Sequence, residues 1–182
     1  MGRLGTYKVD LKGLKEQSAT YEWVVGNDFF ALVEGEDVQK GNVNVKLLLT
    51  KEADLFNLDF ELQGSAVVSC DRCLDDLSLP IDTTGNLKIK LGEDFDDDGD
   101  ILIVPEDDGT VNVAWYIYEF IVLSLPLKKV HAPGKCNREM MSKLSEHLID
   151  EVAEDSDEQD MTSGEIDPRW NDLKKIIEIN ND

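Results

Sequence analysis

Hydrophobic and polar residues alternate along four runs in the first half of the chain. Alternation of this kind is found at residues 43–47, 58–62, 77–81 and 87–91. A period of two with one apolar face is typical of antiparallel strands that cover a core on one side. These runs therefore predict the main strands of a sheet.

Shorter apolar runs add further elements to this pattern. Residues 7–11 and 20–25 are weaker strand candidates, and residues 27–33 fit a short helix with Asn27 as its N-cap. A further pair of strands is expected at residues 101–104 and 111–113. The segment between them contains Pro105 and Gly109 and therefore predicts a turn.

Helical spacing replaces the alternation after residue 114. Apolar residues fall at i, i+3, i+7 and i+10 in one helix, which should end before Pro126: Trp115, Tyr118, Val122 and Leu125. Spacings of four predict a second helix through Met140, Leu144 and Leu148. Strands followed by helices favour an α+β fold, with a curled antiparallel sheet, open or closed into a barrel, followed by about three helices.

The apolar pattern stops at an acidic stretch, which sets the expected domain organisation. Residues 1–149 are predicted to form one α+β domain and residues 150–166 a flexible acidic linker. In residues 167–182, Asp167 suits an N-cap and Pro168 the first helical position. We expect this C-terminal helix to dock on the domain.

Charge is distributed very unevenly along the 182 residues. The net charge is −21, and residues 93–108 and 150–167 hold nine acidic residues each and no basic one. Such a chain repels a phosphate backbone at long range. Residues 126–143 are the exception, with five basic residues against one acidic residue. This segment is either an ordinary solvated surface with lysines near helix ends or a surface that faces an anion.

The three cysteines lie in two short segments, and one histidine accompanies them. Cys70 and Cys73 form a Cys-x-x-Cys motif between two apolar runs, so they are expected at a strand-to-strand turn. His131 and Cys136 flank a Pro-Gly turn. A Cys-x-x-Cys spacer lets two thiolates converge on one ion, and three cysteines with one histidine are a known structural zinc shell. The four residues are therefore a candidate zinc site between sheet and helices.

Other interpretations of these residues remain open. A lone Cys-x-x-Cys motif is weak, and the cysteines can instead be small buried apolar residues beside a loop histidine. A thiol redox site is a third interpretation, although such sites begin a helix and here a strand pattern follows Cys73. An odd number of cysteines does not suit a disulfide framework, so reduced thiols and a cytoplasmic protein are expected.

The sequence gives less support to a calcium site, a catalytic site or a membrane-spanning segment. Residues 94–100 imitate the start of an EF-hand loop, but Pro105 occupies the position of its final glutamate. The carboxylates lie in polar segments where nothing separates their pKa values, so no catalytic residues are assigned and no enzyme is expected. The longest apolar run, at residues 115–127, is too short and polar to span a bilayer, and no membrane partner is expected.

Four motifs, taken in their order, resemble the bacterial YceD-like large ribosomal RNA subunit accumulation proteins. They are Ser-Cys-Asp-Arg-Cys-Leu at residues 69–74, Glu-Phe-Ile-Val-Leu-Ser-Leu-Pro-Leu at residues 119–127, the pair His131 and Cys136, and Asp-Pro-Arg-Trp at residues 167–170 followed by Leu173. The resemblance covers roughly residues 20–180. Many relatives carry a second cysteine pair where this chain has His131 and Cys136.

This resemblance implies a function. It implies a non-enzymatic factor in the synthesis, processing or stability of large-subunit (23S) ribosomal RNA, with ribosomal RNA or a precursor particle as its partner. The alternative is an acidic adaptor that binds a basic ribosomal protein and affects RNA indirectly. The resemblance also favours an anion-facing surface, for which closing the zinc site would gather five residues as phosphate contacts: Arg72, Lys128, Lys129, Lys135 and Arg138.

Overall fold

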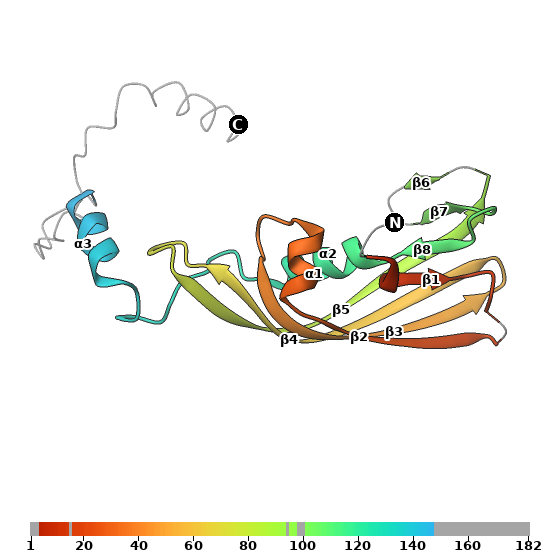
Figure 1. Ribbon diagram of the computed structural model, residues 1–182, viewed down its shortest axis with the longest axis horizontal. Helices are drawn as coiled ribbons and strands as arrows, with labels where there is room; N and C mark the ends of the chain where they lie inside the picture. The colour runs from red at the N-terminus through yellow and green to blue at the C-terminus, as the bar shows by residue number, and fades with distance from the viewer. Residues whose placement is uncertain (1–3, 15, 94, 98–100, 148–182) are drawn as a thin grey trace, which may run out of the picture. The chain divides into compact units, whose positions relative to one another are not determined.

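The computed structural model describes residues 4–14, 16–93, 95–97 and 101–147 (Figure 1). The chain divides into two units, Met1–Glu146 and His147–Asp182, and only the first is described below. The predicted linker at residues 150–166 and the helix at residues 167–182 lie outside the described residues. The domain limits therefore stay predictions.

The strands and helices follow one another largely as the α+β pattern predicts. The strands are β1 (Lys8–Asp10), β2 (Ser18–Val25), β3 (Lys40–Glu52), β4 (Leu55–Ser69), β5 (Asp76–Gly92), β6 (Asp96–Asp97), β7 (Leu102–Pro105) and β8 (Thr110–Asn112). The helices are the 3-10 helix η1 (Gly5–Tyr7) and the α-helices α1 (Asn27–Val33), α2 (Ala114–Ser124) and α3 (Arg138–His147). In the described part, no helix has the length and apolarity needed to cross a bilayer.

The main sheet has the strand order β2-β3-β4-β5-β7-β6 and is strongly curved (Figure 1). Strands β2 to β5 form an antiparallel meander, in which Leu47 of β3 lies opposite Phe60 of β4, and Phe60 lies opposite Gly85 of β5. Strands β1 and β8 form a separate two-stranded sheet. Among the described strands, β2 and β6 are the two edges of the main sheet, so the α+β class is confirmed and the sheet is open.

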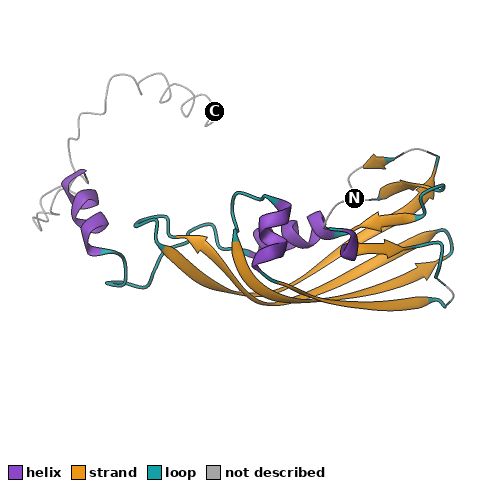
Figure 2. Ribbon diagram, viewed as in Figure 1, coloured by secondary structure: helices purple, strands orange, loops and turns teal. Residues whose placement is uncertain are grey.

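The core lies on the concave face of the sheet, where α1 and α2 cover it (Figure 2). Every second residue of the long strands points into this core, as the alternation predicts. Buried side chains of the central strands are Val43, Val45, Leu47 and Leu49 of β3 and Phe56, Leu58, Phe60 and Leu62 of β4. At Gly85 an added Cβ would lie 2.6 Å from the ring of Phe120. This glycine therefore lets α2 approach the sheet, where the Phe60 and Phe120 ring centroids are 5.2 Å apart.

Strand pairing differs from the sequence pattern in two places. The runs at residues 77–81 and 87–91 belong to one strand, β5, because all their apolar residues occupy odd positions and the small residues between them continue the same face. Strands β7 and β8 are found where they were expected, but they do not pair with each other. Instead β7 lies parallel to β5, so the sheet is mixed, and β8 pairs with β1.

The two short helices also correct details of the prediction. Helix α1 has Gly26 and not Asn27 as its N-cap, and the Asn27 side-chain oxygen accepts a hydrogen bond from the Gly41 amide at 3.0 Å. Helix α2 buries Ala114, Ile117, Tyr118 and Ile121. The predicted stripe was therefore partly wrong, since Trp115 is 57% exposed. Helix α2 is apolar around most of its circumference, so spacing alone does not identify its buried face.

Candidate metal centre

Cys70 and Cys73, the first half of the predicted metal site, lie in the turn between β4 and β5. The Cys70 amide donates a hydrogen bond to the Asp75 carbonyl at 2.9 Å, and the Leu74 amide donates to the Cys70 carbonyl at 2.9 Å. Leu74 has a φ of 62°, which closes the turn in the left-handed region. Cys70 is 0% exposed and Cys73 is 2% exposed. The predicted strand-to-strand turn is thus confirmed, with both thiols turned inward.

The second half lies in the segment between α2 and α3. The Lys135 amide donates to the Ala132 carbonyl at 3.0 Å, and Gly134 has a φ of 77°. Proline at the second position of a turn and a glycine of positive φ at the third are typical of a type II turn. The predicted Pro-Gly turn is confirmed, and it reverses the chain so that His131 and Cys136 face the same point.

Hydrogen bonds join the two halves. The Asp71 amide donates to the Lys129 carbonyl at 2.7 Å, and the Lys129 amide donates to Oδ2 of Asp71 at 2.6 Å. A carboxylate that accepts a backbone N–H makes a stronger bond than a neutral acceptor does. Asp71 therefore fixes the segment after α2 against the cysteine turn, a role that spacing alone did not indicate.

The four side chains meet in one place, which we call the cysteine–histidine cluster: Cys70, Cys73, His131 and Cys136. Their ligand atoms all lie within 4.8 Å of one another. The Sγ atoms of Cys70 and Cys136 are 4.0 Å apart, and Sγ of Cys73 is 3.4 Å from Nδ1 of His131. Tetrahedral zinc with bonds of about 2.3 Å to sulfur requires sulfur atoms about 3.8 Å apart. The donor set and its spacing therefore fit zinc with small adjustments.

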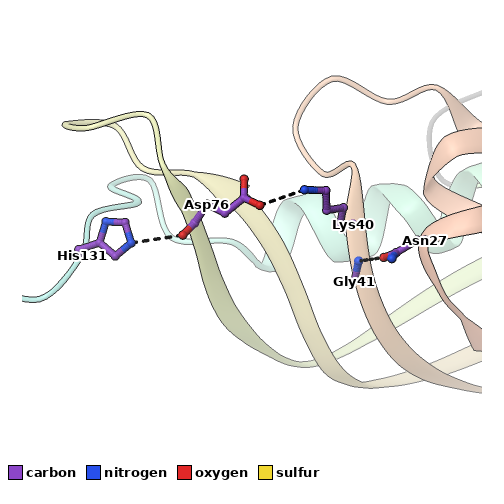
Figure 3. A network of polar contacts seen from close by, with 5 residues as sticks. All are labelled: Asn27, Lys40, Gly41, Asp76 and His131. Carbon is purple, nitrogen blue, oxygen red and sulfur yellow. Dashed lines mark hydrogen bonds and ion pairs between the residues drawn. The ribbon is translucent and has the colours of Figure 1, made fainter. Parts of the chain in front are cut away.

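The orientation of His131 also suits a metal ligand. Its Nε2 lies 3.3 Å from the carbonyl oxygen of Asp76, a contact in which Nε2–H is the donor (Figure 3). In the neutral imidazole this bond leaves Nδ1 without a proton, and Nδ1 lies 3.4 Å from Sγ of Cys73. Metal-binding histidines are commonly held in this way by a backbone carbonyl. The side chain of Asp76 forms an exposed ion pair with Lys40 at 3.0 Å.

The thiols have different proton affinities because of their surroundings. Burial alone would raise the pKa of Cys70, but hydrogen bonds from the backbone amides of Arg72, Cys73 and His131 outweigh it and lower the pKa to about 6. Burial raises the pKa of Cys136 to about 11, helped by hydrogen bonds and charge from Cys70 and Cys73. The hydrogen bond to Cys70 raises the pKa of His131. Accumulated negative charge of this kind is what a divalent cation relieves.

The arrangement suits a structural metal centre better than a catalytic one. Four protein donors complete the usual zinc shell, and a catalytic zinc needs an open position for water or substrate. When bound, zinc would act as a cross-link between β4, β5 and the segment after α2. The interpretation of the cysteines as unrelated apolar residues does not explain why three sulfur atoms and an imidazole nitrogen converge.

The five predicted phosphate contacts are not equivalent. Arg72, Lys128, Lys135 and Arg138 are exposed, while Lys129 is half-buried, with its Nζ 3.9 Å from Oδ1 of Asp37. The hydrogen bonds between Asp71 and Lys129 bring Arg72 beside the segment that carries the others. Residues 94 and 98–100 of the calcium-like loop lie outside the described residues, so that alternative is not tested.

Replacing Asp71 with Ala should weaken zinc binding. The Lys129 amide would lose its charged acceptor, so the segment that carries His131 and Cys136 would be held less firmly. We expect a loss of metal affinity of about tenfold, in the range seen when outer partners of a metal site are removed. A competition titration with a chromophoric chelator measures this. Asp75→Ala is the control and should leave the affinity unchanged, because this exposed carboxylate lies in the same turn and its side chain has no hydrogen bond to the residues that the structure describes.

The sequence around the cysteine–histidine cluster matches the model of a known protein family. The family model described as "Large ribosomal RNA subunit accumulation protein YceD" matches residues 58–177. No match was found among curated proteins or among solved structures. The matched range covers more than half of the chain and contains the whole cysteine–histidine cluster. The protein therefore belongs to the YceD family of large ribosomal RNA subunit accumulation proteins.

Proposed function

We propose that the protein is a non-enzymatic, cytoplasmic factor in the synthesis, processing or stability of large-subunit (23S) ribosomal RNA. In this proposal it contacts that RNA, or a precursor particle, through its basic cluster, which we define as Arg72, Lys128, Lys135 and Arg138. One contact carries the proposal: the Asp71 amide donates a hydrogen bond to the Lys129 carbonyl. This contact brings the basic segment, residues 126–143, beside the turn that contains Arg72.

The positions of these side chains support phosphate contact. All four are exposed. Arg72 and Lys135 are each next to a cysteine of the cluster, Lys128 precedes Lys129, and Arg138 lies two residues after Cys136. Zinc bound by Cys70, Cys73, His131 and Cys136 would restrict the backbone that carries Arg72, Lys135 and Arg138. A positively charged surface held in this way binds the sugar-phosphate backbone without reading base sequence.

We leave Lys129 out of the basic cluster in this proposal, because its Nζ lies 3.9 Å from Oδ1 of Asp37 and its backbone amide bonds to Asp71. Whether Lys129 also contacts phosphate stays a prediction. Asp71, Asp75 and Asp76 are exposed in or next to the turn that contains Arg72, so the positive charge of this region comes mainly from residues 128–138. Acidic residues would repel RNA and limit the contact to that segment.

Charge reversal in the basic cluster tests the proposal. The variant Lys128→Glu, Lys135→Glu and Arg138→Glu should bind large-subunit ribosomal RNA at least about tenfold more weakly at moderate salt. Because three phosphate contacts are lost, the slope of log affinity against log salt should fall by about 2. Filter binding or fluorescence anisotropy over a range of salt concentrations measures both quantities.

A matched control separates local contact from total charge. Lys46, Lys88 and Lys90 are exposed on strands β3 and β5, and their replacement by Glu makes the same change in net charge. This control should keep the wild-type slope. Equal losses in both variants, or no loss in either, would contradict direct contact through the basic cluster. The second result would favour the adaptor that binds a basic ribosomal protein.

A further inference from the structure

A groove lies between helix α2 and the loop that follows α1. It has a volume of about 360 Å³ and is lined on one side by Glu34, Gly35, Glu36 and Asp37 and on the other by Trp115, Tyr118, Glu119, Val122 and Leu123. The α2 side of the groove is thus mostly apolar, with Glu119 as its one acidic residue, and the other side is acidic. It is separate from the cysteine–histidine cluster and contains none of its residues.

The acidic side of this groove is held in place by Tyr118. The amides of Asp37 and Val38 donate hydrogen bonds to the Tyr118 hydroxyl at 3.2 Å and 3.3 Å. An added Cβ at Gly35 would overlap the Tyr118 ring, so the loop lies directly against α2. The carboxylates of this loop are therefore carried by a backbone that is fixed relative to the apolar face of α2.

The apolar side of the groove contains exposed side chains. Leu123 is 73% exposed and stands on the same outward side of α2 as Trp115 and Val122. The Trp115 ring is supported by Tyr118, with ring centroids 5.6 Å apart. Trp and Leu side chains exposed together at a groove are typical of a protein-binding surface, and Trp is enriched among residues that dominate binding.

Charge decides which kind of partner this groove suits. Within the part of the chain that the structure describes, no ion pair is formed by Glu34, Glu36 or Glu119, and Asp37 forms one, with Lys129. An uncompensated acidic side repels RNA and attracts Lys and Arg. We propose that this groove binds a basic peptide segment of another protein, with an apolar side chain of the segment against Trp115 and Leu123.

Two other occupants agree less well with the charges. A second copy of the chain carries a net charge of −21 and would be repelled. Residues 167–182 of the same chain contain three basic and four acidic residues and so offer no net positive charge. A basic segment of another protein instead carries the charge that the acidic side of the groove attracts.

Binding of a labelled peptide to the full-length protein tests this proposal. The probe is a short fluorescein-labelled peptide in which Lys and Arg surround one central Leu, and its partner probe carries Ser in place of that Leu. The Leu123→Ser and Glu119→Lys double variant should bind the first peptide at least about tenfold more weakly than wild type does. Both residues are exposed, so the variant should fold.

The control variant is Leu48→Ser with Glu61→Lys, which makes the same two changes on exposed positions of β3 and β4. It should bind the peptide as wild type does, and the Ser-containing peptide should bind the wild-type protein more weakly than the Leu-containing one. Equal binding of the two peptides, equal loss in the control, or no binding would overturn the proposal. Two further outcomes would overturn the proposal by identifying the chain itself as the occupant. One is peptide binding that appears only after Leu173→Ser, a change in residues 167–182 of the same chain. The other is a dimer that Leu123→Ser dissociates.

Discussion

Removal of zinc with a chelator is expected to release the segment around His131 and Cys136 while the main sheet stays folded. Cys70 and Cys73 are buried and Cys136 is half-buried, but none of the three belongs to the apolar cluster between the sheet and helices α1 and α2. Phe60, Leu62 and Ile117 of that cluster keep their contacts without the metal. The binding free energy of a structural zinc, about 10 to 16 kcal/mol in small zinc domains, should therefore act mainly on local order.

Hydrogen exchange on the full-length protein measures this separation. The amides of Asp71 and Lys135, which are bonded to carbonyls of the second segment, should lose protection when zinc is removed. The amide of Leu47, in the centre of β3, should keep its protection. Restoring zinc should reverse the change and serves as the control. Loss of protection throughout the sheet would show that the metal supports the whole fold, and no change at Asp71 would show that no metal joins the two segments.

Zinc binding at neutral pH should release protons, and the apparent affinity should rise with pH. The pKa of Cys136 is raised to about 11 by burial and by the neighbouring thiols, so this thiol is protonated near pH 7 and must lose its proton to bind metal. The pKa of His131 is also raised, chiefly by its hydrogen bond to Cys70, so its proton competes with the metal as well. Each displaced proton should increase affinity about tenfold per pH unit.

Calorimetric titration in buffers of different ionisation enthalpy counts the released protons. At pH 7.5 the Cys136→Ser variant should release about one proton fewer than wild type, because a serine hydroxyl keeps its proton. The pKa of Cys70 is lowered to about 6, so its thiol contributes little at this pH. A proton count that the Cys136→Ser variant leaves unchanged, or an affinity independent of pH, would contradict the assigned ligand set.

Alternation and turn chemistry were enough to predict much of the fold and the position of the site. The apolar positions of β3 and β4 were identified because each strand has one face in the core. The turn at Pro133 and Gly134 was identified because only a few conformations suit that pair. Reasoning from these local features placed the four ligand residues at two turns, and the structure brings them together.

Other features depend on long-range packing that local patterns do not encode. The parallel pairing of β7 with β5 depends on contacts between separate strands, and the buried face of α2 depends on how the helix packs on the sheet. Asn27 is favourable as an N-cap, yet its side chain bonds to Gly41 of another strand. The role of Asp71 likewise depends on a backbone group of Lys129, which only the folded chain brings near.

Elemental analysis of the full-length protein, purified under reducing conditions without chelator, tests most directly whether the cysteine–histidine cluster is a zinc centre. We expect one equivalent of zinc per chain in the wild-type protein, and none in the Cys70→Ser and Cys73→Ser double variant. A folded, fully reduced wild-type protein without stoichiometric metal would contradict this expectation, as would an equal zinc content in the two proteins.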